Sequence, residues 1–311
     1  MALFGKKKNK MEISLFNINS YNIDTSKFSS LLHDNIVAEF EENFANYVGA
    51  SHAVSLNSAT NAIYLINKLW YKEVYNIPTM IPPVVCNALI TSGSNIEFKD
   101  NTHWIGNSFD LCSGVVDSAQ KVEHNQYEME CENDDLMYFS FYPTKMVGSC
   151  DGGMIVSNDK AKIDLIREYT FNGMSQEPNN WERKQTSIGY KMYMNSISAY
   201  IANENLKRLD EKKHKINIVR EKYNDAFGLT NMSQHLYRIN VKNRNEFMQR
   251  AKGENIVCGV HYESTHLNPI FNQTHLSLPK SEAEAKTTVS IPFHEKLSKQ
   301  DIEKIIKLVN G

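Results

Sequence analysis

Three short apolar runs in the middle of the chain constrain the fold most, because each has the length of one buried strand. They occupy residues 114–119, 136–141 and 152–157, and polar segments separate them. Continuous apolar runs of this length, rather than alternating ones, are typical of strands that are covered on both faces. We therefore expect a sheet at the centre of the molecule with helices on both sides.

The flanking segments predict those helices and further strands. Apolar residues recur at spacings of three or four between Ile36 and Val48, which predicts an amphipathic helix that ends near Gly49. Further helices are expected at 62–70, 160–171, 196–219, 245–252 and 299–309. Further strands are expected at 53–56, 237–241 and 256–261, and residues 79–98 are expected to form a strand, a short helix and a strand.

This order of elements predicts an α/β fold with unequal parts. We expect a tail or arm at residues 1–34, then a large domain at 35–205 with a mixed or mostly parallel sheet between helices. A small C-terminal α/β domain is expected at 206–311.

Composition excludes several classes of protein. The net charge is −2, so no strong positive field indicates nucleic-acid binding. No run approaches the roughly 20 apolar residues that a membrane span needs, and the basic first ten residues lack the apolar core of a secretory signal. The five scattered cysteines favour reduced thiols over a disulfide framework or a zinc site. We expect a cytoplasmic protein without a metal ion.

Residues 58–60 indicate an anion site. Ser58, Ala59 and Thr60 stand between the expected strand at 53–56 and the expected helix at 62–70. The first N–H groups of a helix lack intrahelical partners, and the helix dipole favours negative charge there. Ser58 and Thr60 could also simply cap the helix, and both uses depend on the same N–H groups.

Two more polar residues fall at strand ends. Asp117 ends one buried run and Lys145 lies in the turn after the next. In open α/β sheets, ligands bind outside the carboxyl ends of the strands. Pyridoxal phosphate (PLP) chemistry requires a Schiff-base lysine, a carboxylate at the ring nitrogen and a phosphate site. Spacing alone does not separate these roles from an exposed turn lysine and an ordinary helix N-cap.

The sequence around these residues resembles the DegT/DnrJ/EryC1/StrS family of fold-type-I, PLP-dependent sugar aminotransferases. The resemblance rests on VVDSAQ at 115–120, YFSFYPTK at 138–145 and CDGGMIVS at 150–157. Other matches follow in the family's order and extend the resemblance over about residues 35–310. They are FEENFANYVG at 40–49, GYKMYMNSI at 189–197, LKRLD at 206–210, GVHY at 259–262, HLNP at 266–269 and SIPF at 290–293.

The resemblance implies roles for individual residues. Lys145 would be the Schiff-base lysine and proton shuttle, Asp117 would pair with the pyridinium nitrogen, and Gln120 would lie by the ring hydroxyl. The phosphate would be held by Ser58, Ala59, Thr60 and Ser140. Lys191 would reach the phosphate of a neighbouring subunit, which implies a homodimer with shared active sites.

The chain also departs from the family pattern. Ala59 replaces a usual Gly, Lys191 a usual Asn, and Asp151 a Glu. The region between Phe98 and Val115 is contracted to about sixteen residues, where the family carries several more elements. Residues 82–87, where the family stacks an aromatic side chain on the PLP ring, contain no aromatic residue.

The resemblance implies amino transfer, usually from glutamate, to a nucleotide-linked keto-deoxysugar, with pyridoxamine phosphate (PMP) as the intermediate cofactor form. His261, Tyr262 and His266 are candidates for the substrate cleft, although a structural role is as compatible with the two histidines. A metal site at the histidines is not expected, because no carboxylate or cysteine has ligand spacing with them. Two alternatives stay open: a PLP- or PMP-dependent sugar dehydratase, and a degenerate member that binds a sugar nucleotide without turnover.

Overall fold

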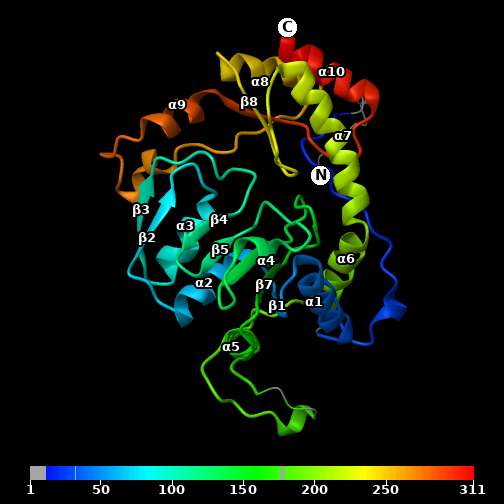
Figure 1. Ribbon diagram of the computed structural model, residues 1–311, viewed down its shortest axis with the longest axis vertical. Helices are drawn as coiled ribbons and strands as arrows, with labels where there is room; N and C mark the ends of the chain where they lie inside the picture. The colour runs from blue at the N-terminus through cyan, green and yellow to red at the C-terminus, as the bar shows by residue number, and fades with distance from the viewer. Residues whose placement is uncertain (1–11, 32, 176, 178) are drawn as a thin grey trace, which may run out of the picture.

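The computed structural model describes residues 12–31, 33–175, 177 and 179–311, and it has the α/β organisation that the sequence predicts (Figure 1). The strands are β1 His52–Leu56, β2 Val74–Pro78, β3 Asn95–Lys99, β4 Phe109–Cys112, β5 Val115–Asp117, β6 Leu136–Ser140, β7 Gly153–Ser157, β8 Tyr237–Asn240 and β9 Thr288–Ile291. The α-helices are α1 Asn35–Val48, α2 Ala59–Leu69, α3 Pro83–Thr91, α4 Gln126–Glu130, α5 Lys160–Thr170, α6 Ser196–Lys207, α7 Leu209–Phe227, α8 Arg244–Gly253, α9 Pro279–Thr287 and α10 Lys299–Asn310. Short 3-10 helices occur at Thr25–Lys27, Asn180–Glu182, Thr265–Leu267 and Pro269–Phe271.

The central sheet is mixed and has the order β1-β7-β6-β5-β4. Only β5 and β6 pair in parallel; β7 runs antiparallel to both of its neighbours, and β4 antiparallel to β5. The register places Gly153 opposite both Leu56 and Ser140, and Asp117 opposite Tyr138. The carboxyl ends of β1, β5 and β6 therefore meet at one edge of the sheet, which is where the expected site residues lie.

Both faces of this sheet are covered, as its continuous apolar strands predict. Phe139 packs with Phe44 of α1 in one core cluster, at ring centroids 4.9 Å apart. Tyr138, the neighbouring residue on β6, belongs to the cluster on the other face, which includes α2 and α3. Side chains alternate between the two faces of a strand, so one short strand supports both layers.

The contracted region still completes the sheet. Strand β4 pairs with β5 and places Phe109 opposite Asp117, while β2 and β3 form a separate parallel pair beside α3. The preceding residues 101–107 form a run of turns that packs its two largest apolar side chains, Trp104 and Ile105, into the core. The wall next to Asp117 is thus built by a short local segment.

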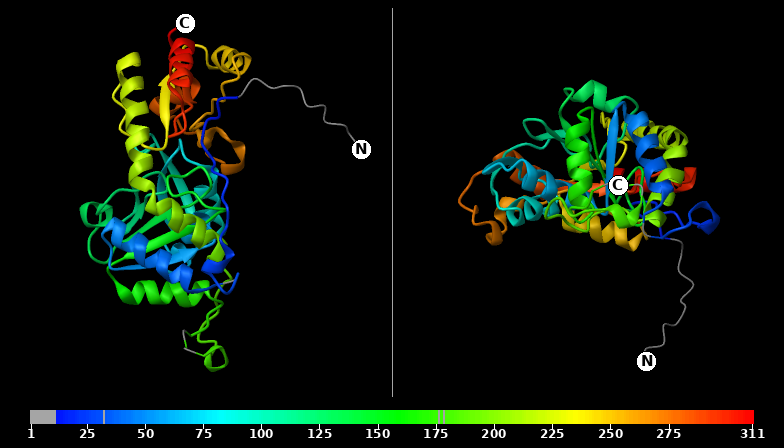
Figure 2. Two further views of the ribbon diagram at one scale, coloured as in Figure 1. Left: turned by 90° about the vertical axis from the view of Figure 1, so that its right-hand side faces the viewer. Right: turned by 90° about the horizontal axis from the view of Figure 1, so that it is seen from below.

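The C-terminal part packs α7, α8 and α10 with β8 and β9, and the N-terminal arm runs along both parts of the molecule (Figure 2). The backbone of Ile13 bonds with Asn255 and Val257, and the carbonyl of Leu31 accepts a bond from Ser196. The arm predicted at 1–34 is therefore packed where it is described, and the first ten residues, expected to be a solvated tail, lie outside the described residues. We propose that the boundary between the large domain and the small C-terminal domain lies near residue 206, at the end of α6.

Two of the predicted elements differ from the structure. The helix expected at 196–219 is broken at Arg208 into α6 and α7. The strand expected at 256–261 is wrong: Ile256 and Gly259 each form only a single bridge, to Ile13 and Ser290. These residues lie between two different partners, so no continuous ladder forms.

Strands β4 and β9 and helices α4 and α9 were not predicted from the sequence.

No helix in the described part of the chain is long and apolar enough to cross a membrane.

Candidate active site

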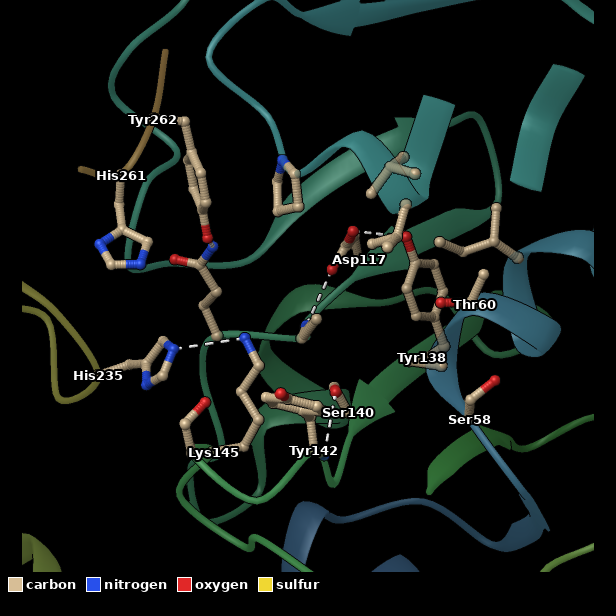
Figure 3. Close-up of a pocket in the computed structure, with 18 of the residues that line it drawn as sticks. Ser58, Thr60, Asp117, Tyr138, Ser140, Tyr142, Lys145, His235, His261 and Tyr262 are labelled. Atoms are coloured by element: carbon tan, nitrogen blue, oxygen red, sulfur yellow. Dashed lines mark hydrogen bonds between the residues drawn. The ribbon is translucent and has the colours of Figure 1, made fainter. Parts of the chain in front are cut away.

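A cavity of about 480 Å³ opens at the edge where β1, β5 and β6 end. Ser58 and Thr60 lie at one end of it and His261 and Tyr262 at the other, with Asp117 and Lys145 between them (Figure 3). The cavity therefore brings together the anion site, the carboxylate and the lysine that the sequence singles out.

Lys145 projects its amine into the cavity from the turn after β6 (Figure 3). Its backbone N–H donates to the carbonyl of Tyr142 at 2.8 Å, and the amine of Lys212 donates to the carbonyls of Lys145 and Met146 at 3.3 and 2.9 Å. Loss of hydration in the cavity lowers the pKa of Lys145 from 10.5 to about 8, against the opposing effect of the Asp117 charge. With a pKa of about 8, about a tenth of this amine is neutral at pH 7, and the neutral form is the one that acts as a base or nucleophile.

Asp117 is buried at the end of β5. Burial raises the pKa of its carboxyl group, and the hydrogen bonds from Tyr138 and from the backbone of Ala119, with the charge of Lys145, act in the opposite direction. Its Oδ2 accepts from the Tyr138 hydroxyl at 2.5 Å and its Oδ1 from the Ala119 N–H at 2.8 Å. Two donors thus offset part of the hydration that this carboxylate loses on burial.

The N-terminus of α2 lies at the end of the cavity where the sequence predicts an anion site. Ser58 is the N-cap, and its hydroxyl accepts from the backbone N–H of Asn61 at 3.2 Å, so the N–H groups of Ala59 and Thr60 remain for a ligand. Ser140 also lines the cavity. A Cβ atom on Gly153 would lie 2.7 Å from the Ala59 nitrogen, so only glycine lets β7 approach this helix end so closely.

Gln120 connects the edge of the central sheet with the contracted segment. Its Oε1 accepts from the backbone N–H of Gly106 at 2.7 Å, and its Nε2 donates to the hydroxyl of Tyr262 at 2.8 Å. Tyr262 in turn lies parallel to Trp104, with ring centroids 6.0 Å apart. The contracted segment therefore holds Gln120 directly and contributes an aromatic residue to the cavity wall.

Two predicted residues lie elsewhere. His266 is fully buried outside the cavity lining, where its Nδ1 is 2.7 Å from the Thr79 hydroxyl and its Nε2 is 3.4 Å from Glu282. We therefore leave His266 out of the site. Lys191 is exposed and bridges Phe171 at the base of a protruding segment, also outside the cavity lining of a single chain.

Several cavity residues were missed from the sequence. His235 precedes β8, and its Nε2 lies 3.3 Å from the amine of Lys145, while Phe16 of the N-terminal arm stacks on its ring at 5.3 Å. Tyr138 and Trp104 were also not singled out. The word YFSFYPTK contained Tyr138, but nothing local in the sequence indicates that His235 or Trp104 reaches this cavity.

The part of the cavity wall that comes from the start of α3 is aliphatic. Pro82, Val84 and Val85, at the start of α3, line the cavity there. The absence of an aromatic residue from 82–87 therefore has a structural counterpart, since this part of the lining offers no ring to stack on a ligand.

Comparison with known proteins places the chain in a family. The model of the DegT/DnrJ/EryC1/StrS aminotransferase family matches residues 19–71 and 115–310. This chain belongs to that family. The aminotransferase class expected from the sequence is thereby confirmed, and the unmatched residues 72–114 include the contracted region.

Curated relatives carry related names. The spore coat polysaccharide biosynthesis protein SpsC of Bacillus subtilis is 27% identical over 344 residues, covering 88% of each chain. A UDP-4-amino-4,6-dideoxy-N-acetyl-beta-L-altrosamine transaminase of Campylobacter jejuni is 25% identical and covers 90% of this chain and 93% of its own. The first alignment is longer than this whole chain of 311 residues, so SpsC has segments without a counterpart here.

Solved structures share the fold. The aminotransferase TlmJ of Streptoalloteichus hindustanus has a TM-score of 0.81 at 20% identity, covering 96% of this chain and 98% of its own. Helicobacter pylori PseC, an aminotransferase involved in the biosynthesis of pseudoaminic acid, has a TM-score of 0.79 at 18% identity, with coverages of 95% and 98%. The putative sugar aminotransferase Spr1654 of Streptococcus pneumoniae, solved in a PLP-form, has a TM-score of 0.75 at 18% identity, with coverages of 91% and 92%. The fold-type-I architecture is confirmed.

Proposed function

We propose that this protein is a PLP-dependent aminotransferase that transfers an amino group, with glutamate as the donor, to the keto group of a nucleotide-linked deoxysugar. The observation that supports this most is one cavity holding Lys145, the buried carboxylate of Asp117 and the free N–H groups at the start of α2. The names of SpsC and of the Campylobacter transaminase support a sugar substrate.

The donor set fits PLP. The cofactor carries a phosphate, a pyridine nitrogen, a ring hydroxyl and an aldehyde carbon, and the cavity offers a complementary group for each. Thr60 and Ser140 with the helix N-terminus suit the phosphate, Asp117 the nitrogen, Gln120 the hydroxyl and Lys145 the aldehyde. Ala59 in place of glycine agrees with this, because only its backbone N–H is required.

When bound, PLP supplies a ring that accepts electrons from the carbon that bears the amino group. The chain's residues then have separate tasks. Asp117 holds a proton at the ring nitrogen, and its two hydrogen-bond donors favour its ionised form against the effect of burial. Lys145 moves a proton between two carbon atoms, for which its lowered pKa near 8 is suitable because the amine can both take up and release a proton near neutral pH.

The aliphatic wall has a further task. Pro82, Val84 and Val85 line the cavity with apolar groups and reduce the access of water to the place where the proton moves. Exclusion of water protects reactive species from hydrolysis and strengthens the charge interactions of Asp117 and Lys145.

We further propose a homodimer in which Lys191 approaches the phosphate site of the partner. The segment that begins at Phe171 and ends at Lys191 projects from the main body (Figure 1). Its two ends are joined by an isolated β-bridge between Phe171 and Lys191, and a second bridge joins Met174 to Gln185. Two large apolar side chains on it are almost fully exposed, Trp181 at 82% and Ile188 at 87%. Exposed apolar groups of this size favour a contact with another chain.

We also propose a cytoplasmic location, in keeping with five unpaired cysteines.

Amino transfer is tested by incubating the protein with PLP, a panel of nucleotide-linked keto-deoxysugars and glutamate labelled with heavy nitrogen. The expected result is an amino sugar that carries the heavy nitrogen, and none with Lys145→Ala. Loss of a hydroxyl group from the sugar without incorporation of nitrogen would instead indicate the dehydratase. Binding of a sugar nucleotide with no PLP uptake would indicate the degenerate alternative.

A further inference from the structure

His235 lies beside Lys145 and has no role in the steps described above. Its Nε2 lies 3.3 Å from the Lys145 amine, although the two residues are 90 positions apart and come from different parts of the fold. Figure 3 shows the imidazole beside the end of the lysine side chain, on the side away from Ser58 and Thr60. The amine thus has a polar partner where it enters the cavity.

The imidazole is held in place on several sides. The ring of Phe16 stacks on it with centroids 5.3 Å apart and planes 16° apart. The backbone N–H groups of His235 and Leu236 both donate to the hydroxyl of Ser233 at 3.1 Å. Gly106 fits against Ser233 so closely that a Cβ atom would lie 2.5 Å from that hydroxyl. The contracted segment therefore braces the turn that carries His235.

The surroundings of His235 keep it uncharged. Burial, followed by the charges of Lys145, His261 and Lys212, lowers its pKa well below the usual value. Asp117, which faces Lys145 from β5, is the anionic group that favours the charged amine. A neutral imidazole next to a lysine ammonium can only accept the hydrogen bond, so its Nε2 carries the lone pair and its Nδ1 the proton.

We propose that His235 is a positioning residue, whose Nε2 accepts a hydrogen bond from Nζ of Lys145 whenever that amine is not bonded to the cofactor. The bond holds the amine at the place from which it takes the proton from the substrate carbon and returns it. This inference rests on the proposed role of Lys145. The lysine gains one proton and then loses it, while His235 neither gains nor loses one.

A neutral acceptor suits this task better than a carboxylate. A lysine side chain has four carbons that rotate freely, so a fixed partner reduces the number of positions its amine can take. A carboxylate at the same distance would hold the amine equally well but would favour its charged form strongly, and a charged amine cannot act as a base. The imidazole orients Nζ with a smaller effect on its proton affinity.

The experiment measures the pH at which Lys145 is half-labelled by an amine-reactive anhydride in the cofactor-free protein, by mass spectrometry of its peptide. We expect about 8 for the wild type. In His235→Phe and His235→Leu, loss of the acceptor disfavours the ammonium, and the half-labelling pH falls by about 1. In His235→Gln, whose side chain also offers a neutral acceptor, it returns toward the wild-type value. The thermal unfolding of each variant verifies that it is folded.

The loaded enzyme provides a second measurement. The rate of the half-reaction with glutamate should fall about 10- to 100-fold in both apolar variants, the range expected for one hydrogen bond to a charged group, and recover in His235→Gln. An unchanged half-labelling pH in His235→Phe and His235→Leu would overturn the inference, as would a His235→Gln protein that behaves like them. Absence of any PLP absorbance band in the wild type would refute the proposed function instead, and the labelling result would stand independently.

Discussion

Residues 115–157 and residues 72–114 both line the same cavity, but they do so by different means. The first region is matched by the family and carries Asp117, Ser140 and Lys145 on the edge of a continuous sheet. The second is unmatched and contributes the aliphatic wall of α3 and the turns around Trp104. The difference indicates that the chemistry depends on the sheet edge, while the wall can be rebuilt from a shorter segment.

The contacts of the wall support this interpretation. The backbone N–H of Gly106 donates to Gln120, and Gly106 packs on Ser233, so the short segment supports Gln120 and the turn that carries His235. If the comparison is right, substitutions at the sheet edge reduce the rate or the cofactor affinity strongly, and substitutions in the wall change the binding of the cofactor moderately.

The largest effect is expected from Asp117→Asn. The amide cannot hold a proton at the ring nitrogen, so kcat should fall about 10²- to 10³-fold, the usual cost of removing one preorganised electrostatic group. Steady-state kinetics at saturating PLP measures this, with Asp134→Asn at the exposed surface as the matched control. A kcat within about 3-fold of the wild type would show that the chemistry does not depend on this residue of the sheet edge, because the loss would be far below the range for such a group.

Gly153→Ala should weaken PLP binding about 10- to 100-fold, the value of one or two hydrogen bonds to a charged group. The added Cβ would lie 2.7 Å from the Ala59 nitrogen and displace the start of α2 from the phosphate. Fluorescence titration with PLP gives the Kd. Gly253→Ala is the control, because a Cβ atom there meets nothing within 4 Å.

Tyr138→Phe is expected to lower kcat about 10-fold, in line with a hydrogen bond to a charged group. It also changes the pH dependence. Burial already raises the pKa of Asp117 and the Tyr138 hydroxyl opposes this, so its loss raises the pKa further. Since the ionised form is the active one, the acidic limb of the kcat profile should move to higher pH. A limb that stays in place, with Tyr71→Phe as the control, would show that Tyr138 does not tune Asp117.

The smallest expected effect is a gain in the affinity for PLP, caused by Val84→Phe. Val84→Phe places an aromatic ring in the aliphatic wall, where Val84 is 49% exposed, and should tighten PLP binding about 3- to 10-fold, as one aromatic stacking contact would. Calorimetric titration of the cofactor-free protein measures the change, and Ile90→Phe, also on α3 but outside the cavity lining, is the control. Weaker binding would show that the shortened wall leaves no room for the ring.

The sequence predicted the sheet edge well because its signals are local. A continuous apolar run followed by Asp117, and another followed by the turn with Lys145, indicate both the strands and where they end. The cap at Ser58 and the helix after it are equally local.

Features that depend on distant pairing could not be predicted in the same way. His235 contacts Lys145 although 90 positions separate them, and Phe16 of the N-terminal arm stacks on the ring of His235. The strand expected at 256–261 does not form, because Ile256 pairs with Ile13 and Gly259 pairs with Ser290. No pattern within those six residues indicates that they have two different partners. His266 has the polarity of a site residue, but only the fold shows that Thr79 and Glu282 enclose it.

Reductive trapping shows whether Lys145 forms the covalent bond with PLP on which the proposed function depends. The protein is incubated with PLP, reduced with borohydride, digested and mapped by mass spectrometry. We expect one phosphopyridoxyl group, on Lys145 in the peptide after β6, and no specific label in Lys145→Ala. Labelling spread over surface lysines, or a label on another residue that persists in Lys145→Ala, would contradict it.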